Sequence, residues 1–533
     1  MNLNLESLKN EKFWKEAGVK IPEYNIKAMR EATFREPVWL HFGAGNIFRG
    51  FISSLQHRLL KEGHTDRGIT CAETFDTGII DKIFKPCDNL VMNVILDADG
   101  TMDCEVLASV AEAISADSQK DRLEEIFIQP GLQIVSFTIT EKGYHLYNAA
   151  GELLPIVKED MKSGPDKARH VMGILTALLY KRYKAGKLPL AMLSLDNNPK
   201  NGEKLQGSVL EIAEAWKAAG SVDAGFIDYL TDESQVSFPW SMIDKITPRP
   251  DDAVCKYLLD RGIEGMEPVL TEKNTYIAVF VNAERPQYLV VEDKFPNGRP
   301  PLEKAGVYMA DRDTVSKTER MKVTTCLNPL HTAMSVYGCL LGYTKISDEM
   351  KDRDIVALIK RLGYVEGLPV VTDPGIISPR AFIDEVMNQR LPNPFMPDAP
   401  ARIVLDTSLK VGIRFGETIK NYISMGKSLS DLVSIPLAIA GWMRYLLGID
   451  DTGNLIDISY DPLKDELQEK LKGISWNNPE SYNGQLLPVL SNSNIFGLDL
   501  TATELASRIE GYFVSMLKGS GSVRAVLQRE LQQ

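Results

Sequence analysis

The sequence predicts an α/β protein with an N-terminal, Rossmann-type, doubly wound sheet domain and an all-helical C-terminal domain. Up to about residue 293, short apolar runs typical of strands alternate with segments of helical spacing, which is the pattern of a parallel sheet covered by helices. After about residue 310, strand-like runs become scarce and apolar residues recur at helical spacing. A chain of 533 residues is also too long for a single hydrophobic core.

We therefore expect a dinucleotide-binding domain over residues 1–310 and a helical domain over residues 311–533, with the boundary in the turn-rich segment 294–316. Strands are predicted at 37–42, 68–72, 90–97, 131–140, 188–195, 275–281 and 287–293, and helical stretches at 46–60, 112–127 and 166–185. In the second domain, helical spacing occurs at 330–343, 351–362, 379–389, 429–447, 462–472 and 502–517.

The composition narrows the function classes. A net charge of −12 argues against nucleic acid or an anionic membrane as partner, although it allows a locally basic pocket. The six cysteines form no metal-binding spacing and are typical of reduced thiols. The N-terminus lacks a basic region followed by an apolar run, and no stretch is apolar enough to span a membrane. These features predict a cytoplasmic protein.

The first predicted strand runs into a glycine turn, Gly43-Ala-Gly45, and then into a helix. Strand, glycine turn and helix are the context in which two glycines let the backbone approach a pyrophosphate at a helix N-terminus. Phe48 stands where a third glycine is expected. The alternative interpretation is an ordinary tight β–α turn.

The second predicted strand ends at Glu73, with Asp76 three residues further on. A carboxylate at this position accepts hydrogen bonds from the adenosine ribose and repels a 2′-phosphate, so it favours NAD over NADP. No Arg or Lys occurs in the six residues after Glu73. We predict NAD as cofactor, with NADP as the alternative; either carboxylate could equally be a solvated loop residue.

Two polar clusters are candidates for chemistry. The first, residues 196–202, follows the buried strand 188–195 and contains Asn197; the alternative is a plain turn. The second contains Lys322, Asn328 and His331 within ten residues. A lysine in a dry pocket can transfer a proton, and an Asn amide can stabilise charge on a carbonyl oxygen. The alternative is a surface Lys, a helix cap and a core His.

These clusters carry a family resemblance. The chain resembles the polyol-specific long-chain dehydrogenase family, which includes mannitol 2-dehydrogenase and the hexuronate reductases. The resembling motifs follow one another in the family's order: Phe42-Gly-Ala-Gly-Asn-Ile-Phe-Arg49, Thr138-Ile-Thr-Glu-Lys-Gly-Tyr144, Ser194-Leu-Asp-Asn-Asn-Pro-Lys-Asn-Gly202, Ser241-Met-Ile-Asp-Lys-Ile-Thr-Pro248, Leu327-Asn-x-x-His331, and Arg402 with Lys410.

The resemblance implies a metal-independent, NAD(P)-dependent oxidoreductase that interconverts a secondary alcohol and a ketone, with its active site in the cleft between the two domains. Lys322 would be the catalytic acid/base, and Asn197 and Asn328 would polarise the carbonyl. His331 would position lysine and substrate. The remaining implied residues are Arg402 and Lys410 for the substrate, and Gly43, Gly45, Asn46, Arg49, Glu73, Glu141 and Asp244 for the cofactor.

One departure concerns spacing. The family usually has five positions from Lys to Asn, whereas Lys322 and Asn328 are six apart. On a regular helix at ~100° per residue, the extra residue would turn Lys322 away from its partners. We expect a bulged or non-helical backbone to compensate, because Pro329 disfavours a helical Asn328. Arg320 and Lys317 are more distant substitutes.

The Gly-Asn-x-x-Arg form of the turn resembles the hexuronate reductases most. It implies reduction of fructuronate to mannonate and the reverse oxidation, with tagaturonate reductase or mannitol 2-dehydrogenase as alternatives. A non-enzyme alternative is a dinucleotide-binding redox sensor. The expected partner is a small sugar acid rather than nucleic acid or membrane, and the expected state is a monomer or small homo-oligomer.

Overall fold

The computed structural model describes residues 1–531 and divides into two compact units. The first comprises Met1–Asp97 and Thr101–Ser316, and the second comprises the chain from Lys317 onward together with Ala98–Gly100. Within the described residues, no helix is long and apolar enough to span a membrane.

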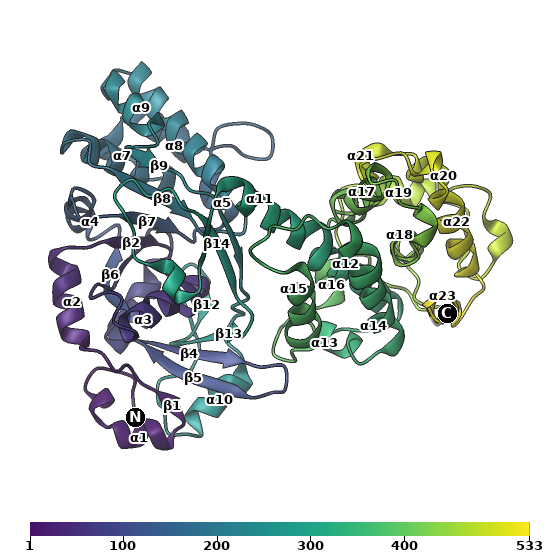
Figure 1. Cartoon of the computed structure of the whole chain (residues 1–533), viewed down its shortest axis with the longest axis horizontal. Coiled ribbons are helices and arrows are strands. Elements are labelled where there is room, and N and C mark those ends of the chain that lie inside the picture. Colours follow the sequence, from purple (N-terminus) through teal and green to yellow (C-terminus); the bar gives the residue numbers. More distant parts are fainter. Residues whose placement is uncertain (532–533) are drawn as a thin grey trace. The chain divides into compact units, whose positions relative to one another are not determined.

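The first unit contains the predicted parallel sheet (Figure 1). Its strands, in spatial order, are β6 (Val110–Ser115), β3 (Ile69–Glu73), β2 (Trp39–Phe42), β7 (Ile134–Phe137), β8 (Leu190–Ser194) and β9 (Val236–Ser237). Every neighbouring pair is parallel. The chain proceeds outward from β2 to β6, then returns to β7 beside β2. Ligands bind outside the carboxyl ends of the strands at such a point of reversal.

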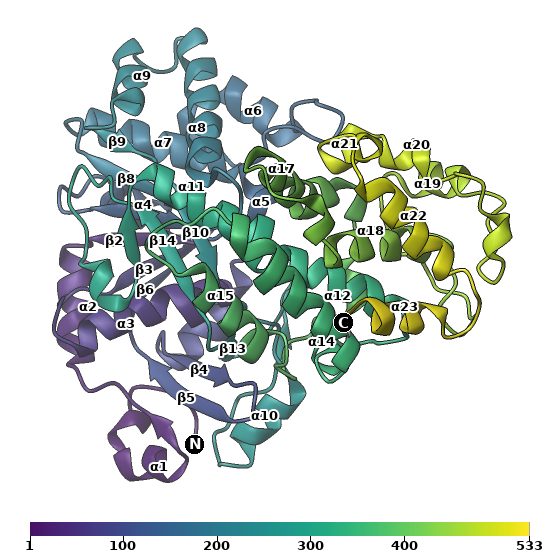
Figure 2. The ribbon, with the colours of Figure 1, turned by 45° about the vertical axis from the view of Figure 1, so that its right-hand side comes forward.

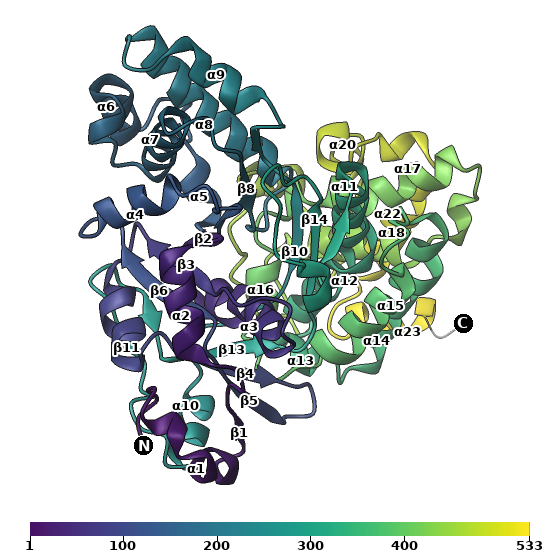
Figure 3. The same ribbon diagram turned by 60° about the vertical axis from the view of Figure 1, so that its left-hand side comes forward.

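Helices lie against this sheet (Figure 3), and their apolar side chains pack on it. α4 (Lys120–Phe127), α7 (Val171–Lys184), α8 (Asn201–Ala218) and α9 (Ala224–Thr231) contribute side chains to one core with β2, β7 and β8. The other helices of this unit are α1 (Glu11–Glu16), α2 (Ile26–Arg35), α3 (Ser53–Lys61), α5 (Thr140–Tyr144), α6 (Pro155–Ser163) and α10 (Asp252–Leu259). α11 (Arg312–Met321) begins in the first unit and continues into the second.

Two local predictions were wrong. The stretch 112–127 is not one helix, because Val110–Ser115 forms the edge strand β6 and the helix begins only at Lys120. The sheet overrides helical spacing there, because β6 pairs in parallel with β3 over its whole length. The predicted strand 275–281 is split into β12 (Tyr276–Ile277) and the start of β13 (Phe280–Glu284).

Three smaller sheets complete the first unit. One contains β1 (Val19–Lys20), β5 (Met102–Leu107), β4 (Val91–Leu96) and β13, and another contains β10 (Ser241–Asp244), β14 (Tyr288–Glu292) and β15 (Tyr308–Ala310). β11 (Val269–Leu270) pairs with β12. The chain passes from the parallel sheet to β10 soon after β9. The end of β8 lies beside the start of β10, where the Ser241 hydroxyl donates to the Ser194 backbone oxygen.

The second unit is helical, as predicted (Figure 2). α12 (Asn328–Leu340) packs against α18 (Ser434–Tyr445), all of whose residues are buried, and α14 (Arg353–Lys360) and α22 (Leu505–Ser515) pack on this pair. The other helices are α13 (Ile346–Glu349), α15 (Pro379–Glu385), α16 (Pro400–Ile403), α17 (Glu417–Ser424), α19 (Lys464–Lys470), α20 (Leu487–Leu490), α21 (Ser493–Phe496) and α23 (Ser522–Leu531). Each of the six predicted helical stretches overlaps one of these helices, and five of them contain it completely.

Candidate active site

The glycine turn opens onto a cavity of about 580 Å³ at the carboxyl ends of β2, β3 and β7. Gly43 has φ of +106°, and a Cβ there would lie 2.2 Å from the backbone oxygen of Thr138, so only glycine fits. A Cβ on Gly45 would meet no atom within 4 Å, which leaves the backbone open to a ligand. A dinucleotide would fit here, because the cavity lies at the strand ends and beside the open glycine turn.

Glu73 fastens the glycine turn to the loop after β3. One carboxylate oxygen accepts the Ala44 N–H at 2.8 Å, and the other accepts the N–H groups of Phe75 at 2.8 Å and Asp76 at 3.2 Å. Three backbone donors occupy most of the four lone-pair positions of a carboxylate. Glu73 lies in the cavity wall, as expected for a cofactor residue, and its contact with the ribose stays a prediction.

Asp76 lies in the same wall, and it has more free hydrogen-bond acceptor capacity than Glu73 for a hydroxyl of the cofactor. Its side chain is 3% exposed, and one oxygen accepts the Thr271 hydroxyl at 2.6 Å. The other oxygen is buried and has no hydrogen-bond partner among the described residues. An unpaired buried acceptor is costly unless a ligand supplies a donor. Phe75, which is 72% exposed, adds an aromatic surface to this wall.

Arg49 and Asn46, both predicted to bind the cofactor, make hydrogen bonds that support the turn. The Arg49 guanidinium is fully buried and donates to the backbone oxygen of Ala278 at 2.7 Å and to Asn46 Oδ1 at 2.8 Å. Burial lowers the pKa of Arg49 to about 9. The Asn46 amide donates to the Pro248 oxygen at 3.2 Å. Their direct contact with a cofactor stays a prediction.

Glu141 and Asp244 do not line the cavity. The Glu141 carboxylate is exposed and lies 3.4 Å from Lys204 Nζ, while its neighbours Thr140 and Lys142 are in the cavity wall. Asp244 is buried at the end of β10, outside the parallel sheet. Their contacts with a cofactor stay predictions.

A carboxylate clamp, made by Asp196, holds the loop that follows β7. One oxygen accepts the Thr140 N–H at 3.0 Å, and the other accepts the Ile139 N–H at 2.9 Å and the Tyr144 hydroxyl at 2.7 Å. Thr140 has φ of +65°, a left-handed conformation that is strained for a β-branched residue. Burial raises the pKa of Asp196 despite these hydrogen bonds. The clamp thus fixes a strained segment of the cavity wall.

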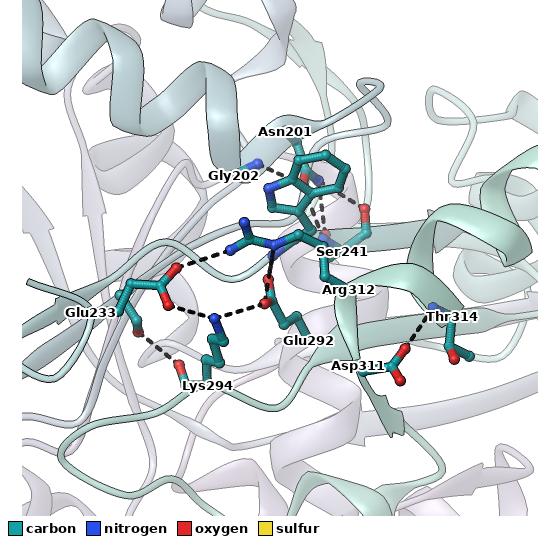
Figure 4. Close-up of polar contacts among 11 residues, drawn as sticks. Asn201, Gly202, Glu233, Ser241, Glu292, Lys294, Asp311, Arg312 and Thr314 are labelled. Atoms are coloured by element: carbon teal, nitrogen blue, oxygen red, sulfur yellow. Dashed lines mark hydrogen bonds and ion pairs between the residues drawn. The ribbon is translucent and has the colours of Figure 1, made fainter. Parts of the chain in front are cut away.

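Asn197, the predicted carbonyl-polarising residue, directly follows this clamp and is exposed. The loop behind it is tied to β10 through Asn201 and Ser241, as Figure 4 shows. The Asn201 amide nitrogen donates to the Ser241 hydroxyl at 2.9 Å, and its oxygen accepts the Ser241 N–H at 3.0 Å. The Ser241 hydroxyl donates to the Ser194 oxygen at 2.6 Å. Asn197 therefore lies on a loop fixed at both ends.

The start of α11 is also fixed within the first unit. Figure 4 shows the Arg312 guanidinium between two carboxylates. Arg312 Nε lies 3.1 Å from both oxygens of Glu292, which is only 2% exposed, and Arg312 Nη2 lies 3.3 Å from Glu233. This anchors the first turn of the helix that leads to Lys322.

The expected bulge before Asn328 is present. Lys322–Cys326 form a π-helical turn, closed by the Leu327 N–H donating to the Lys322 oxygen at 3.1 Å. A π-helical turn takes in one residue more than an α-helical turn, so it offsets the extra residue between Lys322 and Asn328. Lys322 is 3% exposed, which is the dry setting a proton-transferring lysine requires. Asn328 is the first residue of α12, so the expectation that Pro329 disfavours a helical Asn328 was wrong: proline is tolerated in the first turn, where its missing N–H would be unpaired in any case.

His331 lies in a cationic setting on α12. The pKa of His331 is lowered to about 4, chiefly by burial; the carboxylate of Asp398 raises it, and the guanidinium groups of Arg414, Arg402 and Arg390 lower it. The imidazole is neutral at neutral pH. Its buried Nε2 has no hydrogen-bond partner among the described residues and lies 3.9 Å from the Asp398 carboxylate.

The two predicted substrate residues differ in their contacts. The Arg402 guanidinium pairs with the Asp398 carboxylate and is 60% exposed. Lys410 Nζ donates to the backbone oxygen of Leu405 at 2.5 Å, and burial with nearby Arg414 lowers its pKa. Arg402, Arg414 and Arg390 form the cationic group around His331, and Lys410 lies close to Arg402 and Arg414. No role was predicted for Arg414 or for the clamp residue Asp196.

A parallel sheet in this order, with an open glycine turn and a cavity at its point of reversal, defines a dinucleotide-binding protein of the Rossmann class. Comparison with known proteins narrows this class. The description "Mannitol dehydrogenase Rossmann domain" matches residues 38–304, and "Mannitol dehydrogenase C-terminal domain" matches residues 314–516. The chain belongs to the mannitol dehydrogenase family.

Individual relatives agree with this assignment. The chain is 50% identical to a D-mannonate oxidoreductase of Thermotoga maritima, over 99% of this chain and 98% of that protein. A solved D-sorbitol dehydrogenase in substrate-free form is 25% identical, with a TM-score of 0.82 over 99% of this chain and 100% of that one. The ternary complex of Pseudomonas fluorescens mannitol 2-dehydrogenase with NAD and D-mannitol is 26% identical, with a TM-score of 0.69 over 100% of both chains.

Proposed function

We propose that this protein is an NAD-dependent oxidoreductase that reduces the ketone of a hexuronate, fructuronate, to the secondary alcohol of mannonate, and catalyses the reverse oxidation. The main support for this substrate is the 50% identity, over nearly the whole chain, to a D-mannonate oxidoreductase. The cationic group around His331 supports a carboxylated substrate, because a buried carboxylate requires a cationic partner.

NAD(H), when bound, supplies or accepts the hydride. Gly43 and Gly45 would hold its pyrophosphate, and Asp76 together with Glu73 would accept hydrogen bonds from its adenosine ribose. A 2′-phosphate would be repelled by these two carboxylates, which supports NAD over NADP.

Lys322 would give a proton to the carbonyl oxygen during reduction and take it back during oxidation. Asn197 and Asn328 would donate hydrogen bonds to this oxygen as negative charge develops on it. Neutral His331 would orient the substrate through a ring N–H or nitrogen lone pair. Metal independence is expected from the family. Among residues 1–531, no group of three or more His, Cys, Asp or Glu side chains is placed to hold a metal.

The test is the oxidation of NADH and NADPH with fructuronate, tagaturonate and fructose as substrates. Fastest turnover of fructuronate with NADH is expected. A preference for tagaturonate would identify the protein as a tagaturonate reductase. Activity on fructose alone would identify it as a mannitol 2-dehydrogenase. Binding of NADH without turnover of any ketose would favour a redox sensor.

The cellular setting and assembly are part of the proposal. All six cysteines are free thiols, five of them buried, which supports a reducing compartment such as the cytoplasm. We expect a monomer or small homo-oligomer, which light scattering on the purified protein would measure.

A further inference from the structure

Arg414 is a cation of the helical unit that has no individual role in the proposed function. It lies in a second π-helical turn, Gly412–Gly416, which precedes α17. Arg414 is half-buried, and this burial lowers its pKa to about 10. A guanidinium removed from water is normally paired with a carboxylate or with backbone oxygens, as Arg49 is with Ala278, because an unpaired buried charge is destabilising.

No carboxylate pairs with Arg414 among the described residues. Its one hydrogen bond runs from Nη1 to the Thr332 hydroxyl oxygen. The neighbouring Arg402 differs, because it already pairs with Asp398. Arg414 therefore retains most of its five N–H donors for a further acceptor.

The contact with Thr332 places Arg414 beside the predicted catalytic residues. The Thr332 hydroxyl donates to the backbone oxygen of Asn328 at 3.0 Å, and Thr332 directly follows His331. The positive charge of Arg414 also helps to lower the pKa of His331. An anion bound to Arg414 would thus lie close to the first turn of α12.

The backbone holds Arg414 firmly. A Cβ on Gly412 would lie 2.7 Å from the Ile495 oxygen, and one on Gly416 would lie 1.9 Å from the Phe496 oxygen. Both glycines are required for this close approach, so the π-helical turn is seated against α21. A guanidinium on a rigid support, next to Lys410, presents a fixed fork to a planar anion.

We propose that Arg414 binds the carboxylate of the substrate and selects sugar acids over neutral sugars. This inference rests on the proposed function and makes Arg414, rather than Arg402, the principal carboxylate ligand.

The test compares the wild type with Arg414→Met and Arg414→Lys, and with Lys472→Met as a control that removes an exposed positive charge. The measured quantity is the ratio of kcat/KM for fructuronate to kcat/KM for fructose, with NADH saturating. Arg414→Met should lower the ratio roughly 100-fold, Arg414→Lys should lower it less, and the control should leave it unchanged. Inhibition by D-mannonate should weaken in parallel.

Two failures are distinguishable. A wild type that reduces neutral ketoses but no uronate contradicts the proposed function itself. A wild type that reduces fructuronate, with an unchanged ratio in both Arg414 variants, overturns the role of Arg414 alone. Folding is followed by thermal unfolding, where Arg414→Met should be as stable as the wild type or more stable, since it removes a half-buried charge that has no carboxylate partner among the described residues. If Arg414→Met does not fold, the ratio in Arg414→Lys decides.

Discussion

The Asp196 clamp predicts a linked loss of stability and cofactor binding. In Asp196→Asn, the side-chain amide nitrogen cannot accept a hydrogen bond, so at least one of the Ile139 and Thr140 N–H groups loses its acceptor. A lost hydrogen bond to a charged acceptor costs about 1.5–3 kcal/mol, towards the lower end for these partly buried and exposed N–H groups, and the left-handed Thr140 is strained by about 1–2 kcal/mol that the clamp now offsets less well. We expect a loss of about 2–3 kcal/mol.

Thermal unfolding and NADH fluorescence titration test this prediction. The Kd for NADH should rise, because Ile139 and Thr140 line the cavity, and kcat should fall, because Asn197 follows the clamp. Adding Thr140→Gly to Asp196→Asn should restore about 1 kcal/mol, since glycine adopts this backbone freely. Asp232→Asn, at an exposed turn, is the charge control. Unchanged Tm and unchanged Kd in Asp196→Asn would refute the reasoning.

Three further predictions follow from single residues. Lys322→Ala should lower kcat by about 10²–10⁴-fold with the Kd for NADH near that of the wild type; near wild-type turnover would mean that another group carries the proton. Asp76→Ala should reduce the preference for NADH over NADPH in kcat/KM, and an unchanged preference would leave Glu73 as the discriminating carboxylate. Glu349, whose buried carboxyl oxygens have no hydrogen-bond partner among the described residues, has its pKa raised to about 9 by burial. Because the folded state then binds more protons than the unfolded state, the free energy of unfolding should fall as pH rises from about 4.5 towards 9, by up to about 1.4 kcal/mol per pH unit. Glu349→Gln should remove this slope, and parallel pH curves would contradict it.

The parts of the fold that depend on local pattern were predictable from the sequence. Strand β2, the turn at Gly43 and helices such as α12 and α18 follow from apolar spacing and glycine. The edge strand β6 was not predictable from the sequence, because its pairing with β3 outweighs the helical spacing of its apolar residues. The compensating bulge at Lys322 was predictable, since one extra residue in a helical motif can be absorbed in few ways.

Site residues were less predictable where long-range contacts decide their role. Arg49 follows the glycine turn in sequence, but its hydrogen bond to Ala278, 229 residues away, turns it into a structural support. Arg414 carries no local signal except its position four residues after Lys410 between two glycines. The absence of a carboxylate partner is a property of the folded unit, and only the structure reveals it.

The most direct test of the central claim is the reverse reaction. We predict that the protein reduces NAD⁺ with D-mannonate as substrate, at a kcat/KM well above that for D-mannitol, and that the product is a keto-hexuronate. Efficient oxidation of D-mannitol with no measurable oxidation of D-mannonate would contradict the account.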